Sequence, residues 1–383
     1  MEKNTEFDEI RPYDDEEIPQ VIEELIADPE FKRVTGIVVP TIPFETLVQK
    51  MRQCKTKTDF QETFCYDIMW KIAHTCTNGL TLDHTAIKDK NIPYTYISNH
   101  RDIILDSGFL SILLVKQGMN TVEIAIGDNL LIHPWIKKIV RVNKSFIVKR
   151  NLGMKQAHEA SVCLSRYMHY AISEKKESIW IAQREGRAKD SNDRTQDSLL
   201  KMLAMGGEGD IIDRLKSLNI VPLSISYEYD PCDYLKAMEF QLKRDDPDYA
   251  KTTQDDLRSM EIGLFGQKGR VHFQASSCLN KELDKIDRNV SKQELYALIS
   301  ALIDRHIHRN YAIYPGNYIA CDLLSGENGF EDKYTAEEKQ HFQEYINKQL
   351  EKIDLPDNDD GFLYERMLTM YANPLVNYQK AVQ

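Results

Sequence analysis

The chain has 383 residues, 42% of them hydrophobic and 28% charged, which is enough apolar material for a full core and is long for one ordinary domain. Its formal net charge of −11 argues against a protein that coats nucleic acid or an anionic bilayer by overall charge. Any attraction to anions must therefore be local, and we expect no nucleic-acid partner.

The seven cysteines lack the paired spacing of zinc sites and of small disulfide frameworks, so we expect reduced thiols. The ten histidines are dispersed, and the pair at 306 and 308 would face different sides of a helix, which predicts no metal site. The first twenty residues are acidic and lack the apolar stretch of a signal peptide, and the apolar run at 108–115 is too short to span a membrane. We expect a cytoplasmic protein that can lie on the inner face of the cytoplasmic membrane without crossing it.

Apolar residues recur at three- and four-residue intervals over 18–31 and 44–76, which predicts a helical N-terminal region over residues 1–78. From residue 79 the runs TYIS, VEIAIG, SFIVKR, SIWIAQ, NIVPLSISYEY and GRVHFQAS read as strands, and amphipathic segments such as 154–175 and 196–205 read as helices between them. This alternation predicts an α/β domain over 79–280. A strongly helical pattern then begins, and we expect residues 281–383 to form a C-terminal helical extension packed on the domain.

The segment SNHRDIILDS, at 98–107, follows a strand-like run and leads into an apolar helical stretch. A histidine at the carboxyl end of a strand lies where α/β sheets place their sites. Its neutral imidazole can accept a proton near pH 7, and a carboxylate on its other nitrogen would fix the tautomer and stabilise the imidazolium. A structural histidine beside a helix-capping aspartate is the alternative at this point. His100 is therefore a candidate general base.

A second strand-like run ends in Lys149 and Arg150, within a stretch, 129–158, that contains seven Lys or Arg and no acid. In an acidic chain, this local reversal of sign suits a phosphate-bearing ligand or anionic lipid headgroups. A solvated basic face is the alternative.

A third run ends in Glu185, Gly186 and Arg187, where glycine permits a tight turn and the two charges could act on a ligand beyond the strand. An ordinary turn with an exposed ion pair is the alternative. The chain contains no G-x-S-x-G elbow, no phosphate-binding P-loop and no G-x-G-x-x-G after a strand, so serine hydrolase and nucleotide-binding functions have no support.

Four segments, in chain order, resemble the four motif blocks of the glycerol-phosphate and 1-acylglycerol-phosphate acyltransferase family, over about residues 92–230. They are the SNH segment, SFIVKR, REGR and VPLSISYE. The resemblance implies a mixed, largely parallel sheet flanked by helices, with helical N-terminal and C-terminal additions. It also implies transfer of a fatty acyl group from acyl-CoA or acyl carrier protein to a hydroxyl of lysophosphatidic acid or glycerol 3-phosphate. No cofactor is implied beyond this co-substrate, and the expected partners are the lipid acceptor, the acyl donor and, peripherally, the membrane surface.

By the same resemblance, His100 is the base and Asp106 the acid that orients it, although five residues separate them where the family has four. Asp102 is the alternative orienting acid and also has the position of a helix cap. The resemblance further implies residues that bind the acceptor and its phosphate, and residues that shape the site wall. They are Lys149, Arg150, Glu185, Gly186 and Arg187 for the first role, and Val221 and Pro222 for the second.

Two of the four blocks depart from the family's spacing, since the arginine of REGR also stands one position early. A lipid-binding protein that kept the fold and lost turnover is therefore the alternative to an active acyltransferase.

Overall fold

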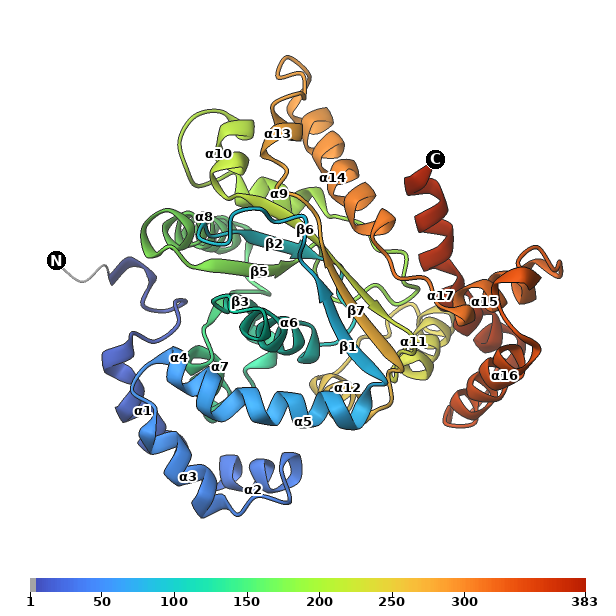
Figure 1. Ribbon diagram of the computed structural model, residues 1–383, viewed down its shortest axis with the longest axis horizontal. Helices are drawn as coiled ribbons and strands as arrows, with labels where there is room; N and C mark the ends of the chain where they lie inside the picture. The colour runs from blue at the N-terminus through green and yellow to red at the C-terminus, as the bar shows by residue number, and fades with distance from the viewer. Residues whose placement is uncertain (1–4) are drawn as a thin grey trace.

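The computed structural model describes residues 5–383, which are built around one seven-stranded sheet (Figure 1). The strand order is β1-β7-β6-β2-β5-β3-β4, in which β6 and β7 are antiparallel and the other neighbours are parallel. The strands are β1 (Gly79–Asp83), β2 (Thr95–Ser98), β3 (Val122–Gly127), β4 (Ser145–Val148), β5 (Ser178–Ala182), β6 (Ile220–Tyr227) and β7 (Arg270–Ala275). The prediction of a mixed, largely parallel sheet flanked by helices is confirmed.

Helices cover both faces of the sheet, and each face has its own apolar core (Figure 1). One face packs against α5 (Tyr66–Cys76) and α6 (Leu105–Lys116). The other packs against α8 (Met154–Tyr170), α9 (Asp197–Leu203), α10 (Ile211–Ser217) and α14 (Lys292–Arg309).

The adjacent strands β2 and β5 send the chain to opposite faces, because β2 leads into α6 and β5 leads towards α9. In parallel sheets, such a divergence leaves a crevice at the carboxyl ends of the two strands. His100 follows β2 and Glu185 follows β5, so the fold brings these two predicted segments to one crevice.

The N-terminal region is helical, as predicted, although its first four residues lie outside the described part of the chain. Two short 3-10 helices (Thr5–Phe7 and Asp15–Glu17) open this region. Its helices pack on α7 (Pro134–Val142). A new helix starts after Thr56, whose hydroxyl accepts the Asp59 N–H. The remaining elements are α1 (Ile18–Ile26), α2 (Pro29–Val38), α3 (Phe44–Gln53), α4 (Lys57–Asp59) and a π-helical turn (Phe60–Cys65).

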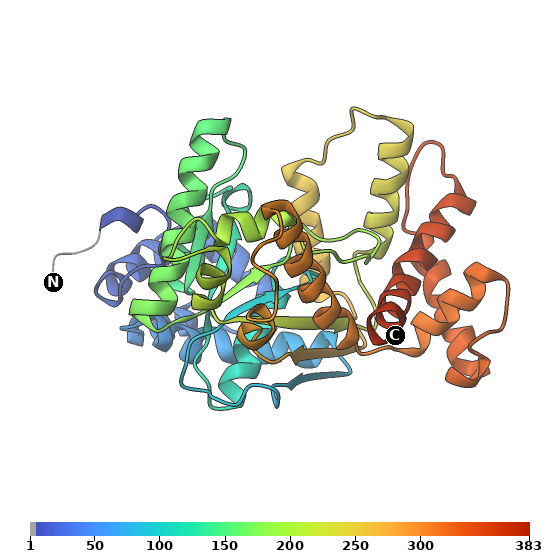
Figure 2. The same cartoon turned by 90° about the horizontal axis from the view of Figure 1, so that it is seen from above.

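Between β6 and β7 the chain forms a helical hairpin of α11 (Asp233–Asp245) and α12 (Thr253–Phe265), which projects beyond the sheet on the same side as α8 (Figure 2). Three helices near the C-terminus, α15 (Pro315–Ser325), α16 (Ala336–Leu350) and α17 (Asp360–Val382), pack on α11 around a separate apolar cluster. The predicted C-terminal helical addition is therefore present.

Two details differ from the sequence-based expectation. β1 was not predicted: it is a short edge strand with only Leu80 fully buried, so its hydrophobic pattern is weak. The strongly helical pattern after residue 280 is divided into two helices, α13 (Asn280–Leu283) and α14, because the Ser291 hydroxyl accepts the Glu294 N–H and starts α14 there. The division at residues 78 and 280 remains a prediction, since apolar clusters extend across both positions.

None of the helices between residues 5 and 383 is long and apolar enough to cross a bilayer. All seven cysteines are free thiols.

Candidate active site

The end of β2 is anchored to its neighbours before the chain turns to His100. The buried Asn99 side chain exchanges two 2.8 Å hydrogen bonds with the backbone of Ile225 on β6, donating through Nδ2 and accepting at Oδ1. The Ser98 hydroxyl accepts a 3.0 Å hydrogen bond from Trp180 Nε1 on β5. These contacts fix the backbone from which the candidate base projects.

His100 and Asp106 form a close pair, with 2.8 Å between Nδ1 and Oδ2. The same carboxylate oxygen accepts the backbone N–H groups of Arg101 at 2.6 Å and Asp102 at 3.1 Å. Asp106 is completely buried, whereas the His100 side chain is 14% exposed and lies edge-on to Trp180. This arrangement fixes one imidazole nitrogen and leaves Nε2 available to a ligand.

Asp102, the alternative orienting acid, has a different set of contacts. Its Oδ1 accepts the N–H groups of Ile104 at 2.9 Å and Leu105 at 2.8 Å, at the start of α6. A Cβ at Gly263 of α12 would overlap its Oδ2, so α12 approaches this carboxylate closely. Burial, and then the charge of Asp106, raise the pKa of Asp102. The structure thus brings Asp106 to the imidazole and Asp102 to the helix start.

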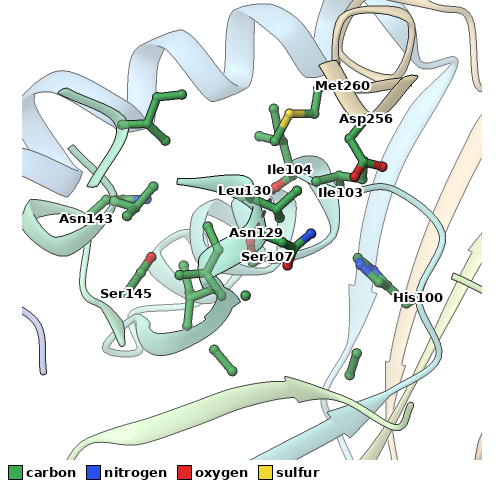
Figure 3. Close-up of a pocket in the computed structure, with 18 of the residues that line it drawn as sticks. His100, Ile103, Ile104, Ser107, Asn129, Leu130, Asn143, Ser145, Asp256 and Met260 are labelled. Carbon is green, nitrogen blue, oxygen red and sulfur yellow. Dashed lines mark hydrogen bonds between the residues drawn. The ribbon is translucent and has the colours of Figure 1, made fainter. Parts of the chain in front are cut away.

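His100 opens onto a large cavity of about 1550 Å³. Figure 3 shows its imidazole directed towards lining residues from α6, from the turn after β3 and from α12. Much of the lining is apolar and comes from segments far apart in the sequence. Representative residues are Phe31, Val38, Met69, Ile104, Ile124, Trp135, Ile139, Leu257 and Met260.

Arg150 and Glu185 also line the cavity and form an ion pair with each other, with 2.7 Å between Nη1 and Oε1. Gly127, at the end of β3, makes room for this arginine, since a Cβ there would meet Arg150 Nε at 2.6 Å. Gly186 has φ +67°, a left-handed conformation that glycine adopts without strain, and it turns the chain between Glu185 and Arg187.

Arg187 is buried and lines the cavity, and within residues 5–383 no carboxylate forms an ion pair with it. Burial opposes its charge, but Cys232, Asp230 and Asp102 more than compensate, so the pKa of Arg187 is raised and the side chain is cationic. Lys189 lies nearby and is bound to Glu239 at 2.6 Å. Burial lowers the pKa of Lys189 to about 8, and the charge of Arg187 contributes to this decrease. Two neighbouring cations therefore line the cavity, of which Lys189 is paired with Glu239 and Arg187 has no ion pair among the described residues.

Most cations of the basic stretch at 129–158 have partners within the fold, whereas the sequence suggested a phosphate-bearing ligand or lipid headgroups as their partners. Arg141 donates to the carbonyl oxygens of Arg11 and Asp8. Four other cations form ion pairs with glutamates from elsewhere in the chain. The pairs are Lys138 with Glu24, Lys144 with Glu177, Lys149 with Glu9, and Arg150 with Glu185.

The predicted wall residues lie away from the cavity lining. Val221 and Pro222 are buried near the start of β6, opposite Tyr96 and Ile97 of β2. The ladder with β7 begins only at Leu223, as expected for a proline that has no N–H to donate.

Residues that the motifs did not single out also contribute to the site. Tyr227, at the end of β6, is buried so close to Asp106 that burial, followed by the charge of Asp106, raises its pKa well above the usual range. Lys189 and Gly127 were likewise missed, because only the fold shows that one lies beside Arg187 and the other beside Arg150.

Comparison with known proteins identifies this part of the chain. Residues 82–226, which run from the end of β1 to β6 and contain all four motif blocks, match the family model described as acyltransferase. They form an acyltransferase domain. The chain thus contains an acyltransferase domain, and His100, Asp106, Arg150 and Arg187 all lie within it.

A search of the curated proteins found no match. Among solved structures, the 1-acyl-sn-glycerophosphate acyltransferase PlsC of Thermotoga maritima aligns over 76% of this chain and 94% of its own, with 10% sequence identity and a TM-score of 0.38. A likeness at that level is too weak to carry an argument about this acyltransferase.

Substitutions of Asp106 and of Asp102 should differ in their effects on kcat and on stability. Asp106→Asn should lower kcat for acyl transfer by about 100-fold or more, because a neutral amide cannot stabilise the imidazolium. Asp102→Ala should leave kcat within about threefold and instead lower the free energy of unfolding by about 1 kcal/mol, through loss of the helix cap. Steady-state kinetics and denaturant unfolding of both variants test this, and a larger kcat loss in Asp102→Ala would reverse the two assignments.

Proposed function

We propose that this acyltransferase moves a fatty acyl group from acyl-CoA or acyl carrier protein to a hydroxyl of lysophosphatidic acid or glycerol 3-phosphate, with His100 as general base. One observation carries the proposal: the free nitrogen of a carboxylate-bound histidine opens into a cavity that also presents a buried arginine with no ion-pair partner among residues 5–383. A base and an anion-binding cation in one cavity suit a hydroxyl acceptor that bears a phosphate.

The chemistry follows from the orientation of His100. Its Nε2 takes the proton of the acceptor hydroxyl as the oxygen attacks the thioester carbonyl, and Asp106 stabilises the imidazolium that forms. The tetrahedral adduct then expels the donor's thiolate, which receives the proton from Nε2. No covalent acyl-enzyme and no cofactor are needed in this sequence.

Arg187 and Lys189 are the groups best suited to hold the acceptor phosphate. Arg187 is charged and buried without an ion pair among the described residues, so a phosphate would give its guanidinium hydrogen-bond acceptors. Arg150 is already bound to Glu185, so in this proposal Glu185 positions Arg150 at the edge of the same site, and Gly186 shapes the turn. Lys149, paired with Glu9, has a lesser share.

The apolar part of the cavity supports an acyl chain as the transferred group. Its walls come from the N-terminal helices, α6, α7, β3 and α12, and burying a methylene group there would contribute about 0.8 kcal/mol. A small polar acceptor alone would leave most of this surface uncovered.

The decisive test is turnover by the purified full-length chain, with lysophosphatidic acid or glycerol 3-phosphate as acceptor and long-chain acyl-CoA or acyl carrier protein as donor. His100→Ala should reduce kcat by about 1000-fold, since the general base is removed. His158→Ala, an exposed histidine on α8, is the matched control and should retain full activity. Binding of the lipids without turnover by the unmodified chain would instead favour the silent lipid-binding alternative.

The phosphate assignment predicts a change that depends on the acceptor. Arg187→Met should raise the KM for lysophosphatidic acid by about 10- to 100-fold, the loss expected for a charged hydrogen bond, and should leave monoacylglycerol, which lacks the phosphate, almost unaffected. Arg166→Met, at an exposed position on α8, serves as the charge-matched control. Equal losses with both acceptors would show that Arg187 has no role in recognising phosphate.

We also propose that the cavity is loaded from a membrane surface. Ile37 of α2 and Phe265 of α12 both line the cavity, and they are 52% and 43% exposed. Exposed apolar side chains at the edge of a lipid-sized cavity can enter the headgroup region of a bilayer.

Flotation with vesicles that contain anionic lipid measures this contact. Ile37→Asp and Phe265→Asp should each lower the bound fraction several-fold, whereas Leu298→Asp, 44% exposed on α14, should not. Since most of the basic stretch is neutralised, added salt should weaken binding only in part. Equal losses in all three variants would contradict a specific apolar contact at the cavity.

A further inference from the structure

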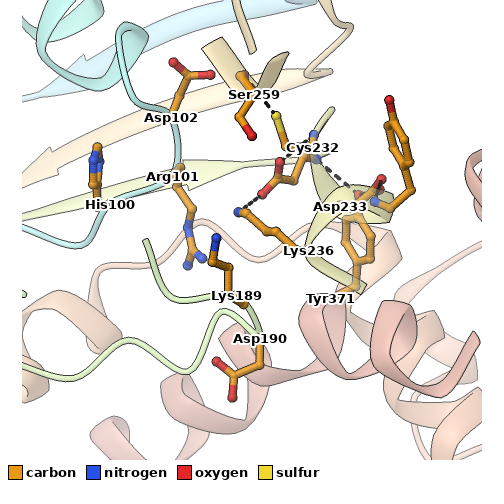
Figure 4. Close-up of polar contacts among 12 residues, drawn as sticks. His100, Arg101, Asp102, Lys189, Asp190, Cys232, Asp233, Lys236, Ser259 and Tyr371 are labelled. Atoms are coloured by element: carbon orange, nitrogen blue, oxygen red, sulfur yellow. Dashed lines mark hydrogen bonds and ion pairs between the residues drawn. The ribbon is translucent and has the colours of Figure 1, made fainter. Parts of the chain in front are cut away.

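Arg101, the residue after His100, turns away from the large cavity. Figure 4 shows the side chains of His100, Arg101 and Asp102 leaving one short segment in different directions. The Arg101 side chain is 7% exposed and lines a separate small cavity of about 30 Å³, behind the candidate base, together with Tyr227 and Tyr311. It is therefore placed to support the site from behind and not to contact the substrate.

The partner of Arg101 is Asp193, which is completely buried in the loop that follows Arg187. Asp193 Oδ2 accepts a 2.6 Å hydrogen bond from Arg101 Nη2 and a 2.7 Å hydrogen bond from the Tyr311 hydroxyl. Burial, and then the charge of Asp193, raise the pKa of Tyr311 well above its usual range, so the hydroxyl stays protonated and donates. A buried Arg–Asp pair needs such additional donors to offset the desolvation of both charges.

Arg101 joins this buried pair to the candidate catalytic pair. Its backbone N–H donates to Asp106 Oδ2 at 2.6 Å, and that oxygen is also the partner of His100 Nδ1. The backbone of Arg101 is therefore hydrogen-bonded to Asp106, and its side chain is hydrogen-bonded to Asp193. Loss of the guanidinium's partner would remove one of the contacts that hold the backbone carrying His100.

The C-terminal extension holds the Asp193 loop at several further points. Asp304 Oδ1 on α14 accepts both the N–H and the hydroxyl of Thr195, each at 2.7 Å. His308 Nε2 lies 2.8 Å from the carbonyl oxygen of Asp193, and Asn373 Nδ2 on α17 donates to Asp190 at 2.7 Å. The loop that carries Asp193 thus packs against the C-terminal extension. From this extension, the Tyr311 side chain contacts the Arg101–Asp193 pair.

We propose that Tyr311 is a positioning residue for His100: its hydroxyl holds Asp193, Asp193 holds Arg101, and Arg101 holds the segment that binds Asp106. The inference deepens the proposed function and rests on it for its kinetic consequence. It implies that the C-terminal extension contributes to the geometry of the active site.

The test compares two full-length variants that each lose one buried tyrosine hydroxyl. In Tyr311→Phe, kcat should fall by about 10-fold with KM values changed less than about twofold, because a displaced base affects the chemical step more than binding. Tyr345→Phe is the matched control, since the Tyr345 hydroxyl also donates to a buried carboxylate, Asp233, at 2.7 Å, and within the described residues forms no hydrogen bond with Arg101 or Asp193. Both variants should lose similar thermal stability, and Tyr345→Phe should keep kcat within about twofold.

A second measurement does not depend on turnover. The proton on His100 Nδ1, assigned by its absence in His100→Ala, should give a resonance that moves in Tyr311→Phe and stays in place in Tyr345→Phe. If the unmodified chain transfers no acyl group but this resonance moves, the proposed function fails and the positioning role stands. An unmoved resonance with unchanged kcat in Tyr311→Phe, or an equal kcat loss in both variants, overturns the inference.

The kcat of a double variant provides the final test of the positioning role. Asp193→Asn should also lower kcat, and the double variant Asp193→Asn/Tyr311→Phe should lose little more than the larger single loss, because both changes interrupt one chain of contacts. Losses that multiply in the double variant would mean that the two residues act independently, contrary to the proposal.

Discussion

The candidate active site depends on one carboxylate oxygen, Asp106 Oδ2. It accepts hydrogen bonds from the backbone of Arg101 and Asp102, lies 2.8 Å from the imidazole of His100, and belongs to a side chain that is completely buried. A buried carboxylate requires such donors to be tolerated, and its place in the first turn of α6 adds the favourable end of the helix dipole. The tight turn after β2 and the start of α6 at Leu105 are both needed for these contacts. Each therefore contributes directly to how the imidazole is held.

Parts of the chain outside the matched acyltransferase segment complete the site. The N-terminal helices and α12 provide much of the apolar wall of the cavity, and α12 also packs Gly263 directly against Asp102. On the other side, the C-terminal extension holds the loop that carries Asp193. The chemical groups thus lie within residues 82–226, whereas their surroundings come from both ends of the chain.

Sequence reasoning predicted what depends on local pattern. The six strand-like runs are all strands, because alternating or continuous apolar residues bounded by turns reflect burial in a sheet. Asp106 and Asp102 could not be separated in the same way, since their roles depend on how the backbone turns between His100 and Leu105. The basic stretch at 129–158 was misleading because its glutamate partners, such as Glu9 and Glu24, are distant in sequence. Tyr311 and Asp193 have no motif at all, and only their contact through the fold reveals them.

The position of β7 in the sheet affects the order in which the strands can pair during synthesis. β1 is the first strand to be synthesised and β7 the last, yet β7 lies between β1 and β6 and is the strand that ties β1 to the sheet. On a ribosome, the five parallel strands β2 to β6, four of which carry motif blocks, can associate before β7 emerges, and β1 must wait unpaired until it does. The matched segment spans residues 82–226, so a fragment cut to its limits would lack β7 and most of β1 and would expose one edge of β6. The domain that sequence comparison delimits is therefore smaller than the unit that can fold.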